Sequence, residues 1–101
     1  LNRVKRTLGR DLLAIKAEQH YLRVYTTLGD DLILYRFGDA VEELEAWDGM
    51  QVHRSYWVAR SAVADFQNRP KGYVILLKNG LQVPVSRSFK NEIDKADFLA
   101  G

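Results

Sequence analysis

The dipeptide Asn79-Gly80 lies between two apolar runs, residues 73–78 and 81–86. Asn-Gly in this setting is the strongest short-range signal for a β-hairpin, because both residues accept the positive φ angles of a tight turn. Pro84 has no backbone N–H to donate, so the second strand is expected at the edge of a sheet. This predicted pair of antiparallel strands indicates that the chain forms antiparallel sheet.

A second hairpin is predicted near the start of the chain. Residues 21–27 alternate in polarity, with Leu22, Val24 and Thr26 on one face, as in a half-buried strand. A turn is expected at residues 28–30 and a return strand over residues 32–37. Further short strands are predicted at residues 12–15, at 51–58 with an interruption at 53–55, and at 62–66. The side chains expected in the core are Leu22, Val24, Trp57, Val58, Val74 and Leu76.

The clearest helix signal follows the second hairpin. Asp39 and Glu42 have the spacing of a capping box, which predicts a short helix that begins at Asp39. Val41 and Leu44 form its expected inward face, and Gly49 is expected to end the segment.

A second short helix is predicted in residues 86–100, from the helical spacing of Phe89, Ile93 and Ala96. Six or seven short strands with one or two short helices define a mainly β fold class. Residues 1–10 carry four positive charges and are interpreted as a basic linker or N-terminal arm. Residues 11–101 then form one domain, which is an ordinary domain length.

Several classes of function are excluded or disfavoured by composition. The absence of cysteine excludes disulfides, thiolate metal sites and cysteine nucleophiles. His20 and His53 lack the spacing of paired zinc ligands, and the glycines form no phosphate-binding pattern. We therefore predict that the chain is not an enzyme and binds no cofactor or metal. A net charge of +2 is a weak indication of an anionic partner.

Three polar segments, residues 18–21, 53–56 and 86–88, combine Arg or His with hydroxyl-bearing side chains. Arginine can donate two hydrogen bonds to the O6 and N7 atoms of guanine, while Ser, Tyr and backbone N–H groups can hold phosphates. Purely structural roles stay open for each segment. Ser-Arg-Ser can be a helix N-cap with a solvated arginine, and His-Arg-Ser-Tyr can be a polar corner between sheets.

These segments and the strands around them resemble the LytTR family of bacterial transcription regulators. Residues 15–26 (IKAEQHYLRVYT) are similar to the family pattern I-x-A-x-x-H-Y-x-x-V, and the acidic helix at 39–44 follows in the expected order. Residues 52–59 (VHRSYWVA) are similar to V-H-R-S-Y-x-V-N, with Ala59 in place of the usual Asn. Residues 80–88 (GLQVPVSRS) are similar to G-x-x-x-P-V-S-R-x. The resemblance covers about residues 12 to 97.

The resemblance implies an elongated arrangement of short antiparallel sheets, a LytTR-like β-sandwich, with one or two short helices. It implies sequence-specific binding of double-stranded DNA for transcription regulation, with loops that enter successive major grooves. Base contacts are expected from Arg54 and Arg87 and, on a looser match, from His20. Some family members have Asn at the position of Arg54, so the base preferred there does not transfer from them. The expected DNA backbone contacts are Arg23, His53, Ser55, Tyr56, Ser86, Ser88, Lys90 and Asn91.

Two other functions are alternatives to DNA binding. One is a small β interaction module that binds a protein partner and no nucleic acid. The other is binding of single strands or RNA through stacked aromatic side chains, namely Tyr21, Tyr25, Tyr56 and Tyr73. For the whole protein, the resemblance favours a cytoplasmic domain, a homodimer on repeated half-sites, and fusion to an N-terminal sensor or membrane segment.

Overall fold

Eight strands form two antiparallel sheets in the computed structural model, which describes residues 12–96 and 98. The first sheet has the order β3-β2-β1-β5-β4, and the second has the order β6-β7-β8. The strands of the first sheet are β1 (Leu12–Glu18), β2 (Tyr21–Thr26), β3 (Gly29–Leu34), β4 (Gly49–His53) and β5 (Tyr56–Ala59). Those of the second are β6 (Val63–Arg69), β7 (Gly72–Leu77) and β8 (Gln82–Val85). The predicted mainly β fold class is confirmed. The basic arm predicted at residues 1–10 lies outside the described residues.

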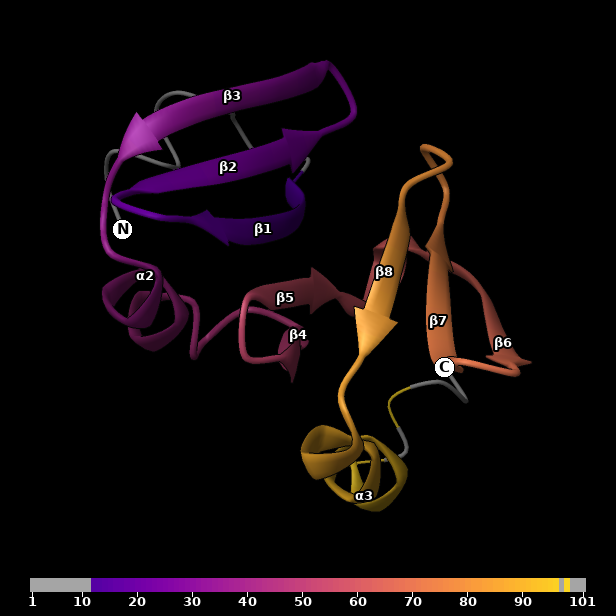
Figure 1. Ribbon diagram of the computed structural model, residues 1–101. Helices are drawn as coiled ribbons and strands as arrows, with labels where there is room; N and C mark the ends of the chain where they lie inside the picture. Colours follow the sequence, from indigo (N-terminus) through magenta and orange to yellow (C-terminus); the bar gives the residue numbers. More distant parts are fainter. Residues whose placement is uncertain (1–11, 97, 99–101) are drawn as a thin grey trace.

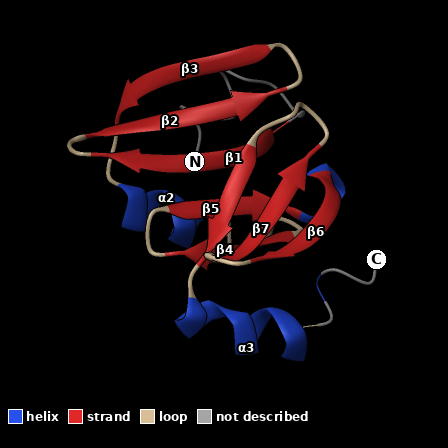
Figure 2. Ribbon diagram, turned by 45° about the vertical axis from the view of Figure 1, so that its right-hand side comes forward, coloured by secondary structure: helices blue, strands red, loops and turns tan. Residues whose placement is uncertain are grey.

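The two sheets follow one another along the chain, joined by the 3-10 helix η1 (Arg60–Ala62) (Figure 1). Helix α2 (Phe37–Glu43) packs against β1, and helix α3 (Arg87–Lys95) packs against β4. In Figure 2, α3 lies at the bottom of the molecule and α2 lies at the left, below β1. The molecule measures 35 × 24 × 23 Å, which agrees with the elongated arrangement that the family resemblance implies.

The hairpin predicted from Asn79-Gly80 is present between β7 and β8. Gly80 has a φ of 89°, and its N–H donates a hydrogen bond to the carbonyl oxygen of Leu77 at 2.9 Å. The Asn79 side chain accepts a hydrogen bond from the N–H of Leu81 at 3.0 Å. Strand β8, which contains Pro84, is an edge strand, as its missing N–H requires.

The face assigned to β2 is confirmed, because Leu22, Val24 and Thr26 are all buried. Trp57 and Val58 in β5 are buried as predicted. The strand that precedes α2 starts earlier than expected, at Gly29 instead of residue 32, and it ends at Leu34. Residues 27–28 form the turn, and Gly29 has a φ of 133°, a conformation that favours glycine.

The face predicted for β7 was wrong. Ile75 and Leu77 are buried, whereas Val74 and Leu76 are only half-buried. Residues 73–77 are apolar without alternation, so polarity carries no information about which side faces the core. The partner strand decides it, because Ile75 pairs with Val83, whose side chain is fully buried.

The capping box predicted for the first helix was also wrong. Helix α2 begins at Phe37, so Arg36 occupies the N-cap position and Asp39 lies within the first turn. The Arg36 side chain makes no capping hydrogen bond. Ala40 is buried beside Leu44, while Val41 is half-buried.

Gly49 does not end that helical segment but is the first residue of β4. A Cβ atom at Gly49 would overlap the indole ring of Trp57 and lie 2.6 Å from the carbonyl oxygen of Val58. This glycine is therefore required by the close approach of β5. In α3, the predicted Ile93 is buried, whereas Phe89 is half-buried and Ala96 is exposed.

Candidate nucleic-acid interface

The fold brings the three polar segments of the sequence to one edge. Lys16 near the end of β1 pairs with Tyr56 at the start of β5, and the N–H of Ala17 donates to the carbonyl oxygen of Ser55 at 2.8 Å. The turn after β1 therefore lies beside the turn between β4 and β5. In Figure 2 both turns lie at the left of the molecule, and the junction that leads into α3 lies below the β4–β5 turn.

That junction is tied to β4 by a backbone hydrogen bond from the N–H of Ser86 to the carbonyl oxygen of Val52, at 3.1 Å. The three connections thus form a row, which we call the loop edge. It consists of residues 19–20, 54–55 and 86–87. Sequence reasoning found all three segments, but their adjacency depends on the pairing of β1 with β5.

Arg54 lies in the two-residue turn between β4 and β5, and its side chain is exposed. Within residues 12–96, its guanidinium has no hydrogen bond or ion pair. His53 precedes it and accepts a hydrogen bond at Nδ1 from the N–H of Ser55, at 3.1 Å. The His53 ring meets the Tyr56 ring edge-on, with centroids 5.6 Å apart. The arginine therefore projects from a turn that its neighbours hold.

Burial lowers the pKa of His53 below its ordinary value, and the nearby Arg54 guanidinium lowers it further. A neutral imidazole can accept a hydrogen bond at one nitrogen and donate at the other. The ring is thus suited to hold Ser55 through Nδ1.

Arg87 is the first residue of α3 and is exposed, and none of the described residues pairs with its guanidinium. The hydroxyl groups of Ser86 and Ser88, on either side of it, lie 3.0 Å apart. Asn91 is exposed one helical turn further along α3. This end of the loop edge therefore presents a cation among small polar groups.

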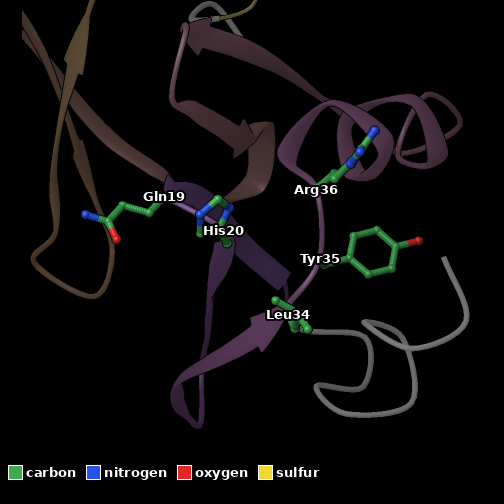
Figure 3. Close-up of a pocket in the computed structure, with 5 residues that line it drawn as sticks. All are labelled: Gln19, His20, Leu34, Tyr35 and Arg36. Carbon is green, nitrogen blue, oxygen red and sulfur yellow. The ribbon is translucent and has the colours of Figure 1, made fainter.

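His20 is exposed in the turn between β1 and β2, where Gln19 has a φ of 57°. It lines a surface pocket of about 340 Å³, whose walls are Gln19, His20, Leu34, Tyr35 and Arg36 (Figure 3). Arg36 is an exposed cation that the sequence analysis missed, because the return strand was expected to continue through it.

Two of the predicted DNA backbone contacts already have partners of opposite charge. The Arg23 guanidinium donates hydrogen bonds to Glu18 at 2.7 Å and to Asp30 at 2.5 Å. The hydrogen bond from Arg23 lowers the pKa of Glu18. The ammonium group of Lys90 lies 2.7 Å from a carboxylate oxygen of Asp94. The positive charge of these two residues is therefore largely balanced within the protein.

The aromatic side chains do not form a stacking platform. Tyr25, Tyr56 and Tyr73 pack against the core, and Tyr73 stacks on Phe66 with ring centroids 5.3 Å apart. Tyr21 is the exposed member of the set, at 46%. This arrangement disfavours binding of single strands through successive bases, which requires exposed rings along a basic groove.

Within residues 12–96, no group of three or more His, Asp or Glu side chains is arranged to hold a metal ion. None of the helices that the structure describes is long and apolar enough to cross a membrane.

Comparisons with known proteins agree with this fold. The chain is 29% identical over 79 residues to the CO-responsive transcriptional regulator RcoM of Rhodospirillum rubrum. The matched region covers 76% of this chain and 34% of that regulator, so the chain spans about a third of the relative's length. A solved LytTr DNA-binding domain from Bacillus cereus superposes with a TM-score of 0.75 at 20% identity, covering 90% of this chain and 82% of that one.

The sequence profile of the LytTr DNA-binding domain family matches residues 2–96, which is nearly the whole chain. This is a family of DNA-binding domains and not of enzymes, in agreement with the sequence-based prediction. The protein belongs to the LytTr DNA-binding domain family.

Proposed function

We propose that the domain binds double-stranded DNA sequence-specifically, for transcription regulation, through the loop edge. The observation that carries this proposal is the pair of exposed arginines, Arg54 and Arg87, on two loops that one backbone hydrogen bond joins. Neither guanidinium is engaged by another described residue, so both are available to a partner. An arginine in this state can make a bidentate contact to guanine.

The order of the loops suggests how the contacts are shared along the duplex. Successive major grooves on one face are about 34 Å apart. The link between Ser86 and Val52 keeps Arg54 and Arg87 closer together than that, even with extended side chains. His20 and Arg87 stand at the two ends of the row. We therefore propose that Arg54 and Arg87 contact base positions of one major groove and that the His20 loop enters the next major groove on the same face of the duplex.

Phosphate contacts would surround these positions. Ser55 lies beside Arg54, while Ser86, Ser88 and Asn91 lie beside Arg87. Hydroxyl, amide and backbone N–H groups are common phosphate ligands, and they fix the register of a protein on DNA. Contacts of this kind would orient the base-reading side chains without adding sequence preference of their own.

The test is binding-site selection with the wild-type chain and the variants Arg54→Ala, Arg87→Ala and His20→Ala. We expect each substitution to relax preference at a different position, by roughly 1–3 kcal/mol per bidentate contact for the two arginines. Arg23→Ala is a matched control, because it removes a guanidinium that Glu18 and Asp30 already hold. If both loop arginine variants keep the wild-type preference and lose only affinity, those residues are phosphate anchors.

A protein contact at a different surface is also supported. Exposed apolar side chains gather at β3 and the adjacent positions, namely Tyr21, Leu28, Leu32 and Leu34. Strand β3 is an edge strand, and an edge of this kind can pair with another chain. Analytical ultracentrifugation of the wild type and Leu34→Lys, with and without DNA, tests the predicted homodimer. A cytoplasmic location and an N-terminal sensor or membrane segment remain predictions.

A further inference from the structure

The turn that carries Arg54 is held from two sides. On one side, Nδ1 of His53 accepts a hydrogen bond from the N–H of Ser55, at 3.1 Å. On the other side, the carbonyl oxygen of Ser55 accepts a hydrogen bond from the N–H of Ala17 in β1, at 2.8 Å. The His53 ring is oriented by its edge-on contact with Tyr56. A single histidine nitrogen therefore helps to determine the conformation of the turn.

The protonation state of His53 follows from this geometry. A ring nitrogen that accepts a hydrogen bond carries no proton, so the ring is neutral with its hydrogen on Nε2. Protonation at Nδ1 would place an N–H group against the N–H of Ser55, and the hydrogen bond would be lost. Burial and the Arg54 guanidinium both lower the pKa of His53, which favours the neutral ring.

Charged groups lie on several elements around β4, which ends at His53: η1 carries Arg60, and β8 carries none. On its own hairpin, Arg54 is the neighbouring cation and Tyr56 the neighbouring phenol. From β1, the Lys16 ammonium lies 5.7 Å from the centroid of the Tyr56 ring, and Glu18 is engaged by Arg23. Helix α3 packs against β4 and carries Arg87, Lys90, Glu92, Asp94 and Lys95. The charge that acts on His53 itself is that of Arg54, so electrostatics opposes protonation.

We infer that His53 is a positioning residue for Arg54: its neutral Nδ1 holds the turn in the conformation in which Arg54 meets its base. The inference rests on the proposed function of Arg54. It leaves Nε2–H free to donate to a phosphate, so the backbone contact predicted for His53 is compatible with the positioning role. Protonated His53 releases the turn, and preference at the Arg54 position is lost while that at Arg87 remains.

Three substitutions separate positioning from phosphate contact. His53→Asn keeps an acceptor, Oδ1, at the place of Nδ1, whereas His53→Gln puts its amide near the place of Nε2, and His53→Ala removes both. In binding-site selection at pH 7.5, we expect His53→Asn to keep the preference that Arg54→Ala identifies. His53→Gln and His53→Ala are expected to reduce it, on the order of tenfold. Preservation of the preference in His53→Ala, or rescue by Gln and not by Asn, would overturn the inference.

The pH dependence provides a second readout. As the pH falls from 7.5 through the pKa of His53, which burial and Arg54 hold below its ordinary value, the wild type is expected to lose preference at the Arg54 position and to keep it at the Arg87 position. His53→Asn is expected to show no such change, because its side chain does not titrate. An even rise in affinity of the wild type at low pH, with unchanged preference, would instead identify His53 as a cationic phosphate contact.

Nitrogen-15 NMR of the free domain distinguishes failure of this inference from failure of the proposed function. We expect His53 as the Nε2–H tautomer and a Ser55 amide shift that follows its titration. An Nδ1–H tautomer would refute the positioning role, whatever the behaviour toward DNA. If the spectra are as expected but the domain does not bind duplex DNA, the proposed function is refuted instead.

Discussion

The N–H of Ser86 donates a hydrogen bond to the carbonyl oxygen of Val52, at 3.1 Å. This bond joins the end of β8 to β4, so the loops that carry Arg54 and Arg87 emerge from neighbouring points of the fold. The two side chains are far apart in the sequence and close in the structure. A ligand that contacts both arginines therefore meets a single surface of the protein.

Binding to duplex DNA is expected to weaken linearly with the logarithm of salt concentration. On the order of 4–8 phosphate contacts, each contributing about −0.9 to the slope, is our expectation for this edge. The number of Ser, Tyr, Arg and Lys residues near the three loops motivates it. Fluorescence anisotropy with a labelled duplex at several salt concentrations measures the slope. A slope near zero, or no binding at low salt, would rule out DNA as the partner.

Arg23→Ala is expected to change the salt slope by less than one unit. A free phosphate-binding cation would contribute about one unit, but Glu18 and Asp30 already balance the charge of Arg23. The double substitution Glu18→Gln and Asp30→Asn is expected to steepen the slope, because it frees that guanidinium. A full unit of loss in Arg23→Ala would show that the ion pairs open when DNA binds.

Ile75→Ala is expected to cost about 2–5 kcal/mol of unfolding free energy, because the side chain is fully buried. Val74→Ala, on the opposite face of β7, is expected to cost about 1 kcal/mol or less, since Val74 is half-buried. Urea denaturation of both variants compares them directly. Equal losses would mean that both faces of β7 are equally packed.

Gly49→Ala is expected to destabilise the domain by about 1–3 kcal/mol, because the added methyl group meets the Trp57 ring and the backbone of Val58. Gly38→Ala is the matched control. It lies in α2 with nothing within 4 Å of the added atom, so it is expected to stabilise by about 0.5–1 kcal/mol. Thermal melts followed by Trp fluorescence report both changes, and loss of stability in both variants would contradict the steric explanation.

Local signals in the sequence determined several elements without help from the fold. Asn79-Gly80 specified the β7–β8 hairpin, because Gly80 accepts the positive φ of the turn and the Asn79 side chain accepts a hydrogen bond from the N–H of Leu81. Alternation in residues 21–26 assigned the buried face of β2, since polar side chains mark the other face. The interruption at His53-Arg54-Ser55 located the turn between β4 and β5, and the family resemblance identified Arg54 and Arg87 as candidates.

Tertiary structure decided what local patterns leave undetermined. Residues of β7 are uniformly apolar, so their polarity does not show which face is buried. The pairing of β7 with β8 determines that face. The start of α2 at Phe37 depends on packing against β1, and the Arg36 side chain makes no capping hydrogen bond that would mark it. Arg23 has the same chemistry as Arg54 in the sequence, yet only cross-strand register brings Glu18 and Asp30 to it. Long-range strand pairing thus decides which arginines remain free for a partner. The Coulomb energy of an ion pair depends on the distance between the two charges in space, and their separation in the sequence does not give that distance.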